Sequence, residues 1–116
     1  MSEAINTALS ALRANFRKLD VTANNLSNAN TQDFKKSRAS FEETEPAGVK
    51  VTISRVETPG TPLPADEILG EGHEMSNVSV EEELIDLIAT RHAFAANVKT
   101  IQAEDEMQGT LLDILA

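Results

Sequence analysis

The sequence predicts a mainly α-helical chain in which an N-terminal and a C-terminal helix form an antiparallel two-helix coiled coil, with a small β-hairpin and extended insertion between them. Apolar residues near both ends recur every three or four positions, the spacing of a coiled-coil seam. All four prolines and four of the five glycines lie within residues 28–76, which interrupts any helix there. Hydrophobic residues make up 41% of the 116, yet only four are Phe and none is Tyr or Trp, which favours long helices packed along a seam.

The first helix is expected over residues 1–27. Neither Gly nor Pro interrupts this segment, and its apolar residues follow one another at alternating spacings of four and three. Asparagines crowd in from Asn24 onward and compete for backbone hydrogen bonds, so the helix is expected to end near Ser27. The predicted seam, which we expect to pair helices and to mediate assembly, consists of Ile5, Leu9, Leu12, Phe16, Leu19, Ala23 and Leu26.

Residues 28–76 are expected to hold a turn, a small β element and an extended connector. Val49, Val51 and Ile53 alternate with polar residues, which predicts a short half-buried strand. Residues 34–41 are its candidate partner. Three prolines between residues 58 and 64 exclude a helix or a central strand, so the chain is expected to run extended there.

The second helix is expected within residues 77–116. Ser79 stands three residues before Glu82, the spacing of a capping box, and Glu81–Glu83 complement the helix dipole in the first turn. Gly109 is expected to weaken the helix near its end by about 1 kcal/mol relative to Ala. The predicted seam is Val80, Leu84, Leu87, Arg91, Phe94, Val98, Ile101, Asp105, Gln108, Leu112 and Leu115, of which Leu84, Leu87, Phe94, Val98, Ile101 and Leu112 are expected to carry helix pairing and assembly.

Two amphipathic helices in one chain are expected to cover each other's apolar stripes, because a lone helix of this length is marginal in water. The pair is itself expected to be marginal and to gain rigidity from neighbouring copies through mass action. Alanines beside both seams, such as Ala8, Ala11 and Ala93, suit close approach in a multi-helix array. They are equally explained by the high helix propensity of Ala.

The net charge of −9 argues against nucleic acid and anionic membranes as partners. Residues 1–40 carry six Lys/Arg against three Asp/Glu, which leaves four against sixteen in residues 41–116. These opposite signs favour bringing the two ends together, although salt screens exposed charges. The N-terminus lacks a secretory signal pattern, so any export is expected to read an uncleaved segment.

No pattern of catalytic, metal-binding or cofactor-binding residues emerges. The chain has no Cys, which excludes thiolate metal sites and a cysteine nucleophile. His73 and His92 have no second ligand at a suitable spacing, and Glu81–Glu83 are better explained by a helix start. No glycine-rich phosphate loop is present, so neither an enzyme nor a small-molecule substrate is expected.

Two segments resemble the signatures of flagellar rod and hook proteins. The first is Ala-Asn-Asn-Leu-Ser-Asn-Ala-Asn-Thr-Gln-Asp-Phe-Lys-Lys at residues 23–36, and the second is Ser-Asn-Val-Ser-Val-Glu-Glu-Glu-Leu-Ile-Asp-Leu-Ile at residues 76–88. The similarity continues through residues 91–99 and 105–112. With its short middle, the chain is most similar to proximal rod proteins of the FlgC type within the basal-body rod family. The turn motif that the resemblance identifies comprises Asn24, Asn25, Asn28, Asn30, Thr31 and Phe34.

The resemblance implies a structural subunit of the bacterial flagellar basal body. Its terminal helices would form the inner coiled-coil layer of an axial tube, with itself and other rod proteins as partners. It would leave the cell through the flagellar type III export apparatus and assemble in the periplasm. Asp33 replaces a glycine that the family often has before the aromatic residue, and Asp tolerates the left-handed conformation such a turn needs.

Two further expectations remain open at this point. Asn24, Asn25 and Asn28 are expected chiefly to satisfy backbone groups where the helix ends, with contacts to neighbouring subunits as a second role. The main alternative function is a soluble helical-hairpin adaptor or chaperone-like protein that binds a partner helix, because the polar seam residues Arg91 and Asp105 are of the kind that select a partner.

Overall fold

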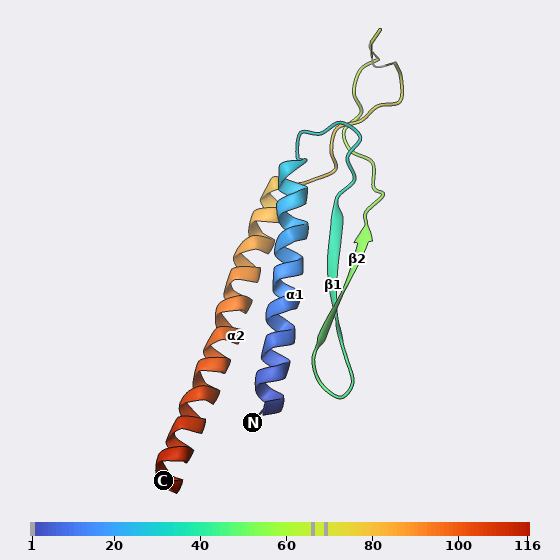
Figure 1. Cartoon of the computed structure of the whole chain (residues 1–116). Helices are drawn as coiled ribbons and strands as arrows, with labels where there is room; N and C mark the ends of the chain where they lie inside the picture. The colour runs from blue at the N-terminus through green and yellow to red at the C-terminus, as the bar shows by residue number, and fades with distance from the viewer. Residues whose placement is uncertain (1, 66, 69) are drawn as a thin grey trace.

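The computed structural model describes residues 2–65, 67–68 and 70–116. It has four elements in chain order: helix α1 (Ser2–Ser27), strands β1 (Ser37–Glu43) and β2 (Val49–Arg55), and helix α2 (Val80–Leu115). The helices run antiparallel, and α1 lies between α2 and the hairpin (Figure 1). The molecule is a slender rod of 79 × 25 × 17 Å. The predicted fold class is confirmed.

The start of α2 follows from its capping sequence. The Ser79 side chain accepts a hydrogen bond from the Glu82 backbone N–H at 3.5 Å, and three glutamates occupy the first turn. This matches the expected capping-box spacing and fixes the first helical residue as Val80. The helix then continues to Leu115, through Gly109 and beyond the point where α1 ends (Figure 1).

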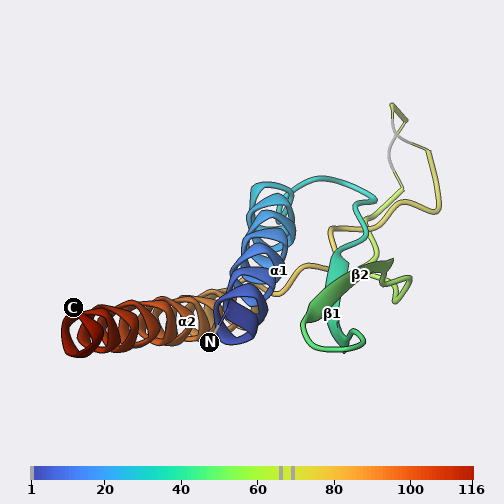
Figure 2. The ribbon, with the colours of Figure 1, turned by 60° about the horizontal axis from the view of Figure 1, so that its bottom comes forward.

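The hairpin pairs β1 with β2 antiparallel, from Ser37 opposite Arg55 to Glu43 opposite Val49. The predicted strand therefore exists, and its partner lies about two residues later than the sequence indicated. Gly48 adopts a φ of +131° in the connecting loop, a region that favours glycine. The hairpin is tied to α1 where the Val49 N–H donates to Ser10 Oγ at 3.1 Å. Figure 2 shows the hairpin lying along α1.

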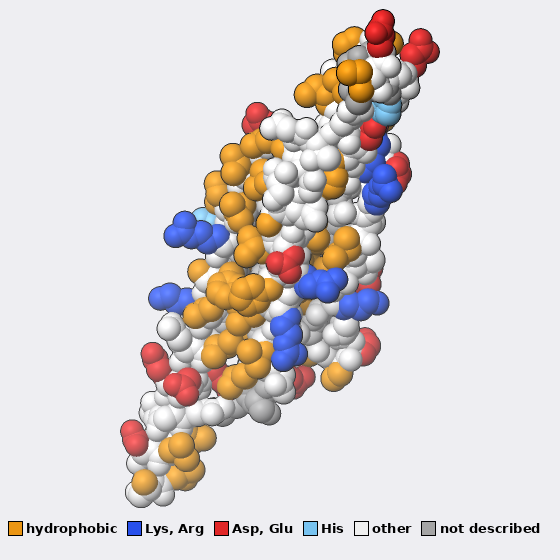
Figure 3. Space-filling view, turned by 45° about the horizontal axis from the view of Figure 1, so that its top comes forward, with side chains coloured by type: hydrophobic (Ala, Val, Ile, Leu, Met, Phe, Trp, Pro, Cys, Tyr) orange, Lys and Arg blue, Asp and Glu red, His pale blue; other side chains and the backbone are white. Residues whose placement is uncertain are grey.

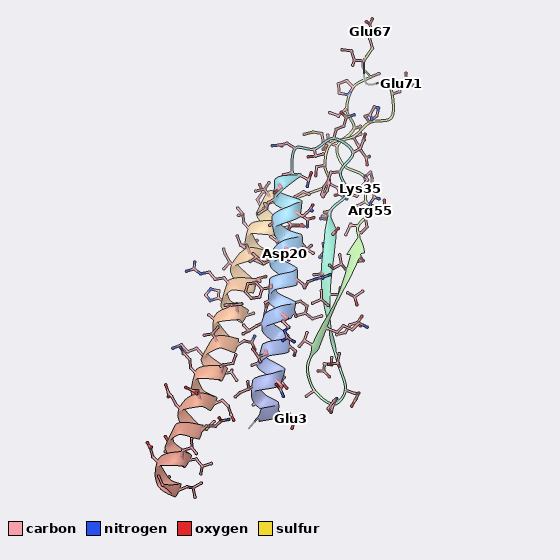
Figure 4. The ribbon with its side chains drawn as sticks, in the orientation of Figure 1. Glu3, Asp20, Lys35, Arg55, Glu67 and Glu71 are labelled. Carbon is pink, nitrogen blue, oxygen red and sulfur yellow. The ribbon has the colours of Figure 1, made fainter. Side chains whose placement is uncertain are left out.

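The connector folds back on itself before α2. Pro62 and Glu74 form an isolated antiparallel bridge, and the Met75 N–H donates to the Thr61 carbonyl at 2.8 Å. Gly60 is required here because a Cβ at this position would lie 2.0 Å from the Met75 carbonyl oxygen. The tip of the connector, with Glu67 and Glu71, projects beyond the helices (Figure 4). Within the described ranges, no helix has the length and apolarity needed to cross a membrane.

Little apolar surface is fully buried in the described part of the chain. Ala8 and Ala14 are the buried hydrophobic residues there. The other deeply buried side chains are polar or charged, and several satisfy themselves within their own helix. Asn15 donates to the Ala11 carbonyl at 2.9 Å, and Thr90 donates to the Asp86 carbonyl at 2.7 Å. The buried polar residues are Asn15, Thr22, Asn25, Glu83, Thr90 and Glu104.

Candidate assembly surface

The fully buried side chains of the two helices are small or polar. Ala8, Asn15 and Thr22 recur every seven residues on α1 and are all 4% exposed or less. On α2, Glu83, Thr90 and Glu104 are similarly buried and fall in one heptad register. Small side chains let the helix backbones approach, and Asn15 and Thr90 bond to carbonyls of their own helices. Glu104 differs, because its Oε1 atom is buried without a hydrogen-bond partner among the described residues.

The predicted apolar seam lies at the edge of this contact. Leu87, Phe94 and Ile101 of α2 are half-buried, as are Leu12 and Leu26 of α1. The remaining predicted residues are Ile5 and Val98, which are half-buried, and Leu9 (39% exposed), Phe16 (55%), Leu19 (37%), Leu84 (46%) and Leu112 (67%). The stripe is thus partly used within the chain and partly left accessible, and its role in assembly remains a prediction.

Phe16 and Phe94 connect the helices on the accessible side. Their ring centroids are 5.2 Å apart and the rings meet edge to face at 73°. A groove of about 360 Å³ opens beside them, lined by Asn15, Phe16, Leu19, Leu87, Thr90, Arg91 and Phe94. We call this the Phe16 groove. Figure 3 shows hydrophobic side chains gathered along the middle of the molecule, with Lys and Arg side chains on both sides.

The part of α2 beyond α1 has no helix beside it among the residues that the structure describes. We call residues 105–115 the distal segment. Every residue in it except Gln108 is exposed. It carries three acidic residues and no Lys or Arg. Its exposed large hydrophobic residues are Met107, Leu111, Leu112, Ile114 and Leu115.

The turn motif after α1 is held by its own side chains. Asn28 Nδ2 donates to the Asn24 carbonyl at 2.9 Å, and Thr31 Oγ1 donates to Asn28 Oδ1 at 3.0 Å. The Phe34 N–H donates to the Thr31 carbonyl at 3.3 Å. Asn30 and the Asn24 side chain are exposed. Asn28 therefore satisfies a backbone carbonyl at the helix end as expected, whereas Asn24 Oδ1 accepts from the Asn28 side chain at 3.1 Å. Any contact with neighbouring subunits stays a prediction.

Asn25 joins three elements of the structure. Its side chain is 1% exposed and exchanges two hydrogen bonds with Ser37 at the start of β1, donating to its carbonyl at 2.8 Å and accepting from its N–H at 3.0 Å. Asn25 Nδ2 also lies 3.2 Å from Glu83 Oε1 on α2. One amide thus locks α1, the hairpin and α2 together. Sequence reasoning placed Asn25 in the turn motif but missed its partner Glu83.

Burial raises the pKa of the Glu83 carboxyl above its usual value of 4.5. The hydrogen bond from Asn25 opposes this, as do the charges of Lys36 and Arg38, while the charge of Asp86 reinforces it. Loss of water is the largest of these influences. The hydrogen bond from Asn25 therefore holds Glu83 at the junction of α1, the hairpin and α2, although burial of its charged carboxylate is unfavourable.

A second polar junction fixes the path from the turn to α2. Asp33 has a φ of +59°, as expected for an Asp in a left-handed turn. Its carboxylate accepts from the Glu74 N–H at 3.0 Å and meets His73 Nδ1 at 2.6 Å. Asn77 accepts from the Lys36 N–H at 2.7 Å and donates to the Val56 carbonyl at 2.9 Å.

An ion pair between Lys35 and Glu74 reinforces the second junction, and Figure 4 places Lys35 where turn, hairpin and connector meet. No group of three or more potential metal ligands occurs among the residues that the structure describes. Buried polar contacts therefore fix the positions of the helices and the hairpin, while large apolar side chains remain at the surface.

Comparison with known sequences finds two family matches, one at each end of the chain. Residues 5–35 match the family described as flagella basal body rod protein. Residues 73–114 match the family described as flagellar basal body rod FlgEFG protein C-terminal. These ranges cover most of α1 with the turn motif, Asn77 in the connector, and nearly all of α2 including Glu83.

A curated relative aligns with part of the chain. The flagellar basal-body rod protein FlgG of Borreliella burgdorferi is 44% identical over 61 residues. That alignment covers 53% of this chain and 22% of the relative, so the chain matches less than a quarter of the relative's length. The narrower FlgC-type resemblance is not confirmed, because these matches name FlgG and the FlgEFG group.

Proposed function

The chain belongs to the flagellar basal body rod protein family, and from that premise we propose that it is a non-enzymatic structural subunit of the basal-body rod that assembles through its terminal helices. Its partners in this proposal are further copies of itself and other rod proteins. It reaches the periplasmic rod through the flagellar type III export apparatus.

One observation carries the proposal beyond family membership. The chain places large apolar side chains on an accessible stripe that runs along both helices, while its buried contacts are small and polar. Exposed apolar surface of this extent is typical of a protein that is completed by neighbours. Figure 3 supports this, because it shows hydrophobic side chains gathered in the middle of the molecule and again toward its lower end.

The sequence-based alternative, an adaptor that binds one partner helix, would use the same stripe. It differs in location, because an adaptor stays with its soluble partner and a rod subunit is retained in the basal body. The two readings are therefore separated by where the chain is recovered, and by whether loss of its first helix stops assembly of the structure itself.

The test is fractionation of the bacterium that carries the protein. We expect the chain in purified basal bodies, and we expect deletion of residues 1–26 to abolish both its incorporation and motility. Asn6→Ala, an exposed change in the same helix outside the seam and the turn motif, serves as the control and should leave both unaffected. Recovery of the native chain only in the cytosol, with none in basal bodies, would contradict the proposal.

A further inference from the structure

The β1–β2 hairpin has two edges, and its hydrogen-bond pattern shows which backbone groups point out of them. In an antiparallel pair, residues that bond across the ladder alternate with residues whose backbone groups point outward. The Thr44 N–H donates to the Gly48 carbonyl at the loop end, and the Val56 N–H donates to the Lys36 carbonyl at the other end. The even-numbered residues between them therefore bond across the ladder, and the odd-numbered residues direct their backbone N–H and C=O groups outward.

The edge of β1 is covered by the helices. Both outward groups of Ser37 bond to the Asn25 side chain of α1, at 2.8 and 3.0 Å. Residues 37–39 also line a cavity of about 360 Å³ that they share with α1 and α2. A strand from another molecule that approached this edge would meet α1, so the edge of β1 is closed.

The second half of β2 has an open edge. Val49 is the last residue on this edge with a partner, because its N–H donates to Ser10 Oγ. The outward groups of Val51, Ile53 and Arg55 take part in no hydrogen bond with another part of the described chain. Figures 1 and 2 show this end of β2 on the side of the hairpin that faces away from the helices. A row of unpaired backbone groups is a template for another strand.

The open edge lacks the usual protection against pairing. Proline and β-bulges are common guards of edge strands. β2 contains no proline, and all seven of its residues pair one-to-one with β1, without a bulge. Val51, Thr52 and Ile53 are β-branched, which favours an extended strand. Ile53 is 41% exposed, so apolar surface at the centre of this edge is also left for a neighbour.

We infer that two copies of the chain pair edge to edge through β2, antiparallel and centred on Ile53, into a four-stranded sheet. This register pairs Ile53 with its equivalent and Val51 with Arg55 of the second copy, so it uses every open position. Each such pair exchanges two hydrogen bonds, which gives about six in all. The same patch is used by both copies, so the contact is isologous and closes as a dimer. The inference goes beyond the proposed function, because the contact uses the hairpin and not the terminal helices.

A second copy is the occupant because this edge is complementary to itself. The strands of the dimer run in the order β1–β2–β2–β1, and α1 lies on the β1 side of each hairpin, so the helices of the two copies stay apart (Figure 1). No like charges stand directly opposite each other, because Arg55 faces Val51. Arg55 is also paired with Glu57 of its own chain at 3.1 Å. The two Ile53 side chains lie next to each other and bury apolar surface.

The test uses the absence of native Cys from the chain. In the inferred register, Thr52 stands opposite Ser54 of the second copy, with Cα atoms about 4.5 Å apart, which a disulfide can span. Both residues are exposed. Full-length Thr52→Cys and full-length Ser54→Cys are mixed under mildly oxidising conditions, and the mixed disulfide is identified by its mass.

The matched control replaces Thr52→Cys by Ser40→Cys. Ser40 is exposed and stands directly opposite Thr52 within the hairpin, but it belongs to the covered strand β1. It would lie one strand farther from Ser54 of the second copy, beyond the reach of a disulfide. We expect several-fold more mixed disulfide from Thr52→Cys than from Ser40→Cys.

Two results would overturn the inference. Equal yields from Thr52→Cys and Ser40→Cys would show that copies do not pair through β2, and would leave the open edge to a strand of another protein. A Thr52→Cys disulfide with itself that exceeds the mixed product would exclude the register centred on Ile53. Neither result bears on the rod function, which depends on recovery of the native chain in basal bodies. A chain that cross-links as expected but is absent from basal bodies would remove the proposed function alone.

Discussion

The junction around Asn25 and the stripe around the Phe16 groove are opposite solutions within one small chain. At the junction, buried polar groups meet partners from three elements, with Asn25 only 1% exposed. Along the stripe, Phe16, Leu84 and Leu112 remain 46–67% exposed. Hydrogen bonds between buried polar groups fix the relative positions of the helices and the hairpin. Large apolar side chains, which would normally be buried in a core, are left exposed. The hydrogen-bond partners at the junction all lie within one chain, whereas the stripe leaves its apolar side chains exposed.

The largest expected effect comes from breaking the junction. Asn25→Ala removes three hydrogen bonds and leaves the Ser37 backbone groups and the Glu83 carboxylate without that partner. At about 1 kcal/mol for each lost bond, we expect the free energy of unfolding to fall by about 3 kcal/mol. Urea unfolding followed by circular dichroism measures it. The exposed neighbour Asn24→Ala loses the hydrogen bond that Asn24 Oδ1 accepts from Asn28 and should change it by less than about 1 kcal/mol, and equal losses for both variants would contradict the assigned role of Asn25.

Gly60 tests whether the connector is held as firmly as the junction around Asn25. Gly60→Ala forces a Cβ against the Met75 carbonyl, and we expect a loss of about 2 kcal/mol in unfolding free energy. Gly109→Ala is the matched change of opposite sign, because nothing lies within 4 Å of that position and Ala favours helix by about 1 kcal/mol. Thermal unfolding of both variants checks this. A Gly60→Ala protein as stable as the native chain would show that the connector is loosely held.

Glu83 gives the junction a pH dependence of known sign. Its pKa is raised by burial, so the folded chain holds this proton more tightly than the unfolded chain does. The stabilisation from the protonated form is fully present below the ordinary value of 4.5 and is lost as pH rises through the raised folded value. Glu83→Gln keeps the oxygen that accepts from Asn25 and removes the charge. We expect this variant to be more stable than the native chain at pH 7 and to match it more closely at pH 4.

Urea midpoints at the two pH values measure the Glu83 effect, which should be smaller than those of Asn25→Ala and Gly60→Ala. Glu82→Gln is the control, because it removes a neighbouring carboxylate whose side chain is 63% exposed and whose ion pair with Lys36, at 3.4 Å, is expected to contribute less than about 1 kcal/mol. A Glu83→Gln protein that is less stable than the native chain at pH 7 would show that the carboxylate charge supports the junction.

The smallest effect on stability is expected for a substitution in the exposed apolar stripe. Leu112→Glu changes a residue that is 67% exposed in the single chain, so dilute stability should shift by less than about 0.5 kcal/mol. Association of copies, followed by sedimentation velocity, should nevertheless be weakened. The exposed change Gln102→Glu adds the same charge outside the distal segment and should leave association closer to that of the native chain. Retained association by Leu112→Glu would contradict the importance of the stripe.

The sequence predicted the elements well because each has a local cause. The Ser79 cap, the alternation at Val49–Ile53 and the prolines of the connector act over a few residues, and the structure places α2, β2 and the connector accordingly. Asp33 is likewise found in the left-handed conformation that a turn at this position needs.

The contact between the helices could not be predicted in the same way. Hydrophobic periodicity identifies an apolar face, but α1 has a second set of positions at a seven-residue spacing, containing Ala8, Asn15 and Thr22, and this set is buried more deeply than the predicted seam. Asn25 and Glu83 are 58 residues apart, so no local pattern connects them. The available signal was the seven-residue recurrence of small and polar residues on both helices, which indicates close approach instead of a leucine seam.

Hydrogen exchange along α2 tests the contrast between the two regions most directly. In dilute chain, amides of residues 84–94 should be protected by the junction and by α1, while those of residues 107–115 should exchange much faster. As concentration rises and copies associate, the amides of residues 107–115 should become protected with little change in residues 84–94. Strong protection of residues 107–115 at the lowest concentration, unchanged on association, would contradict the account.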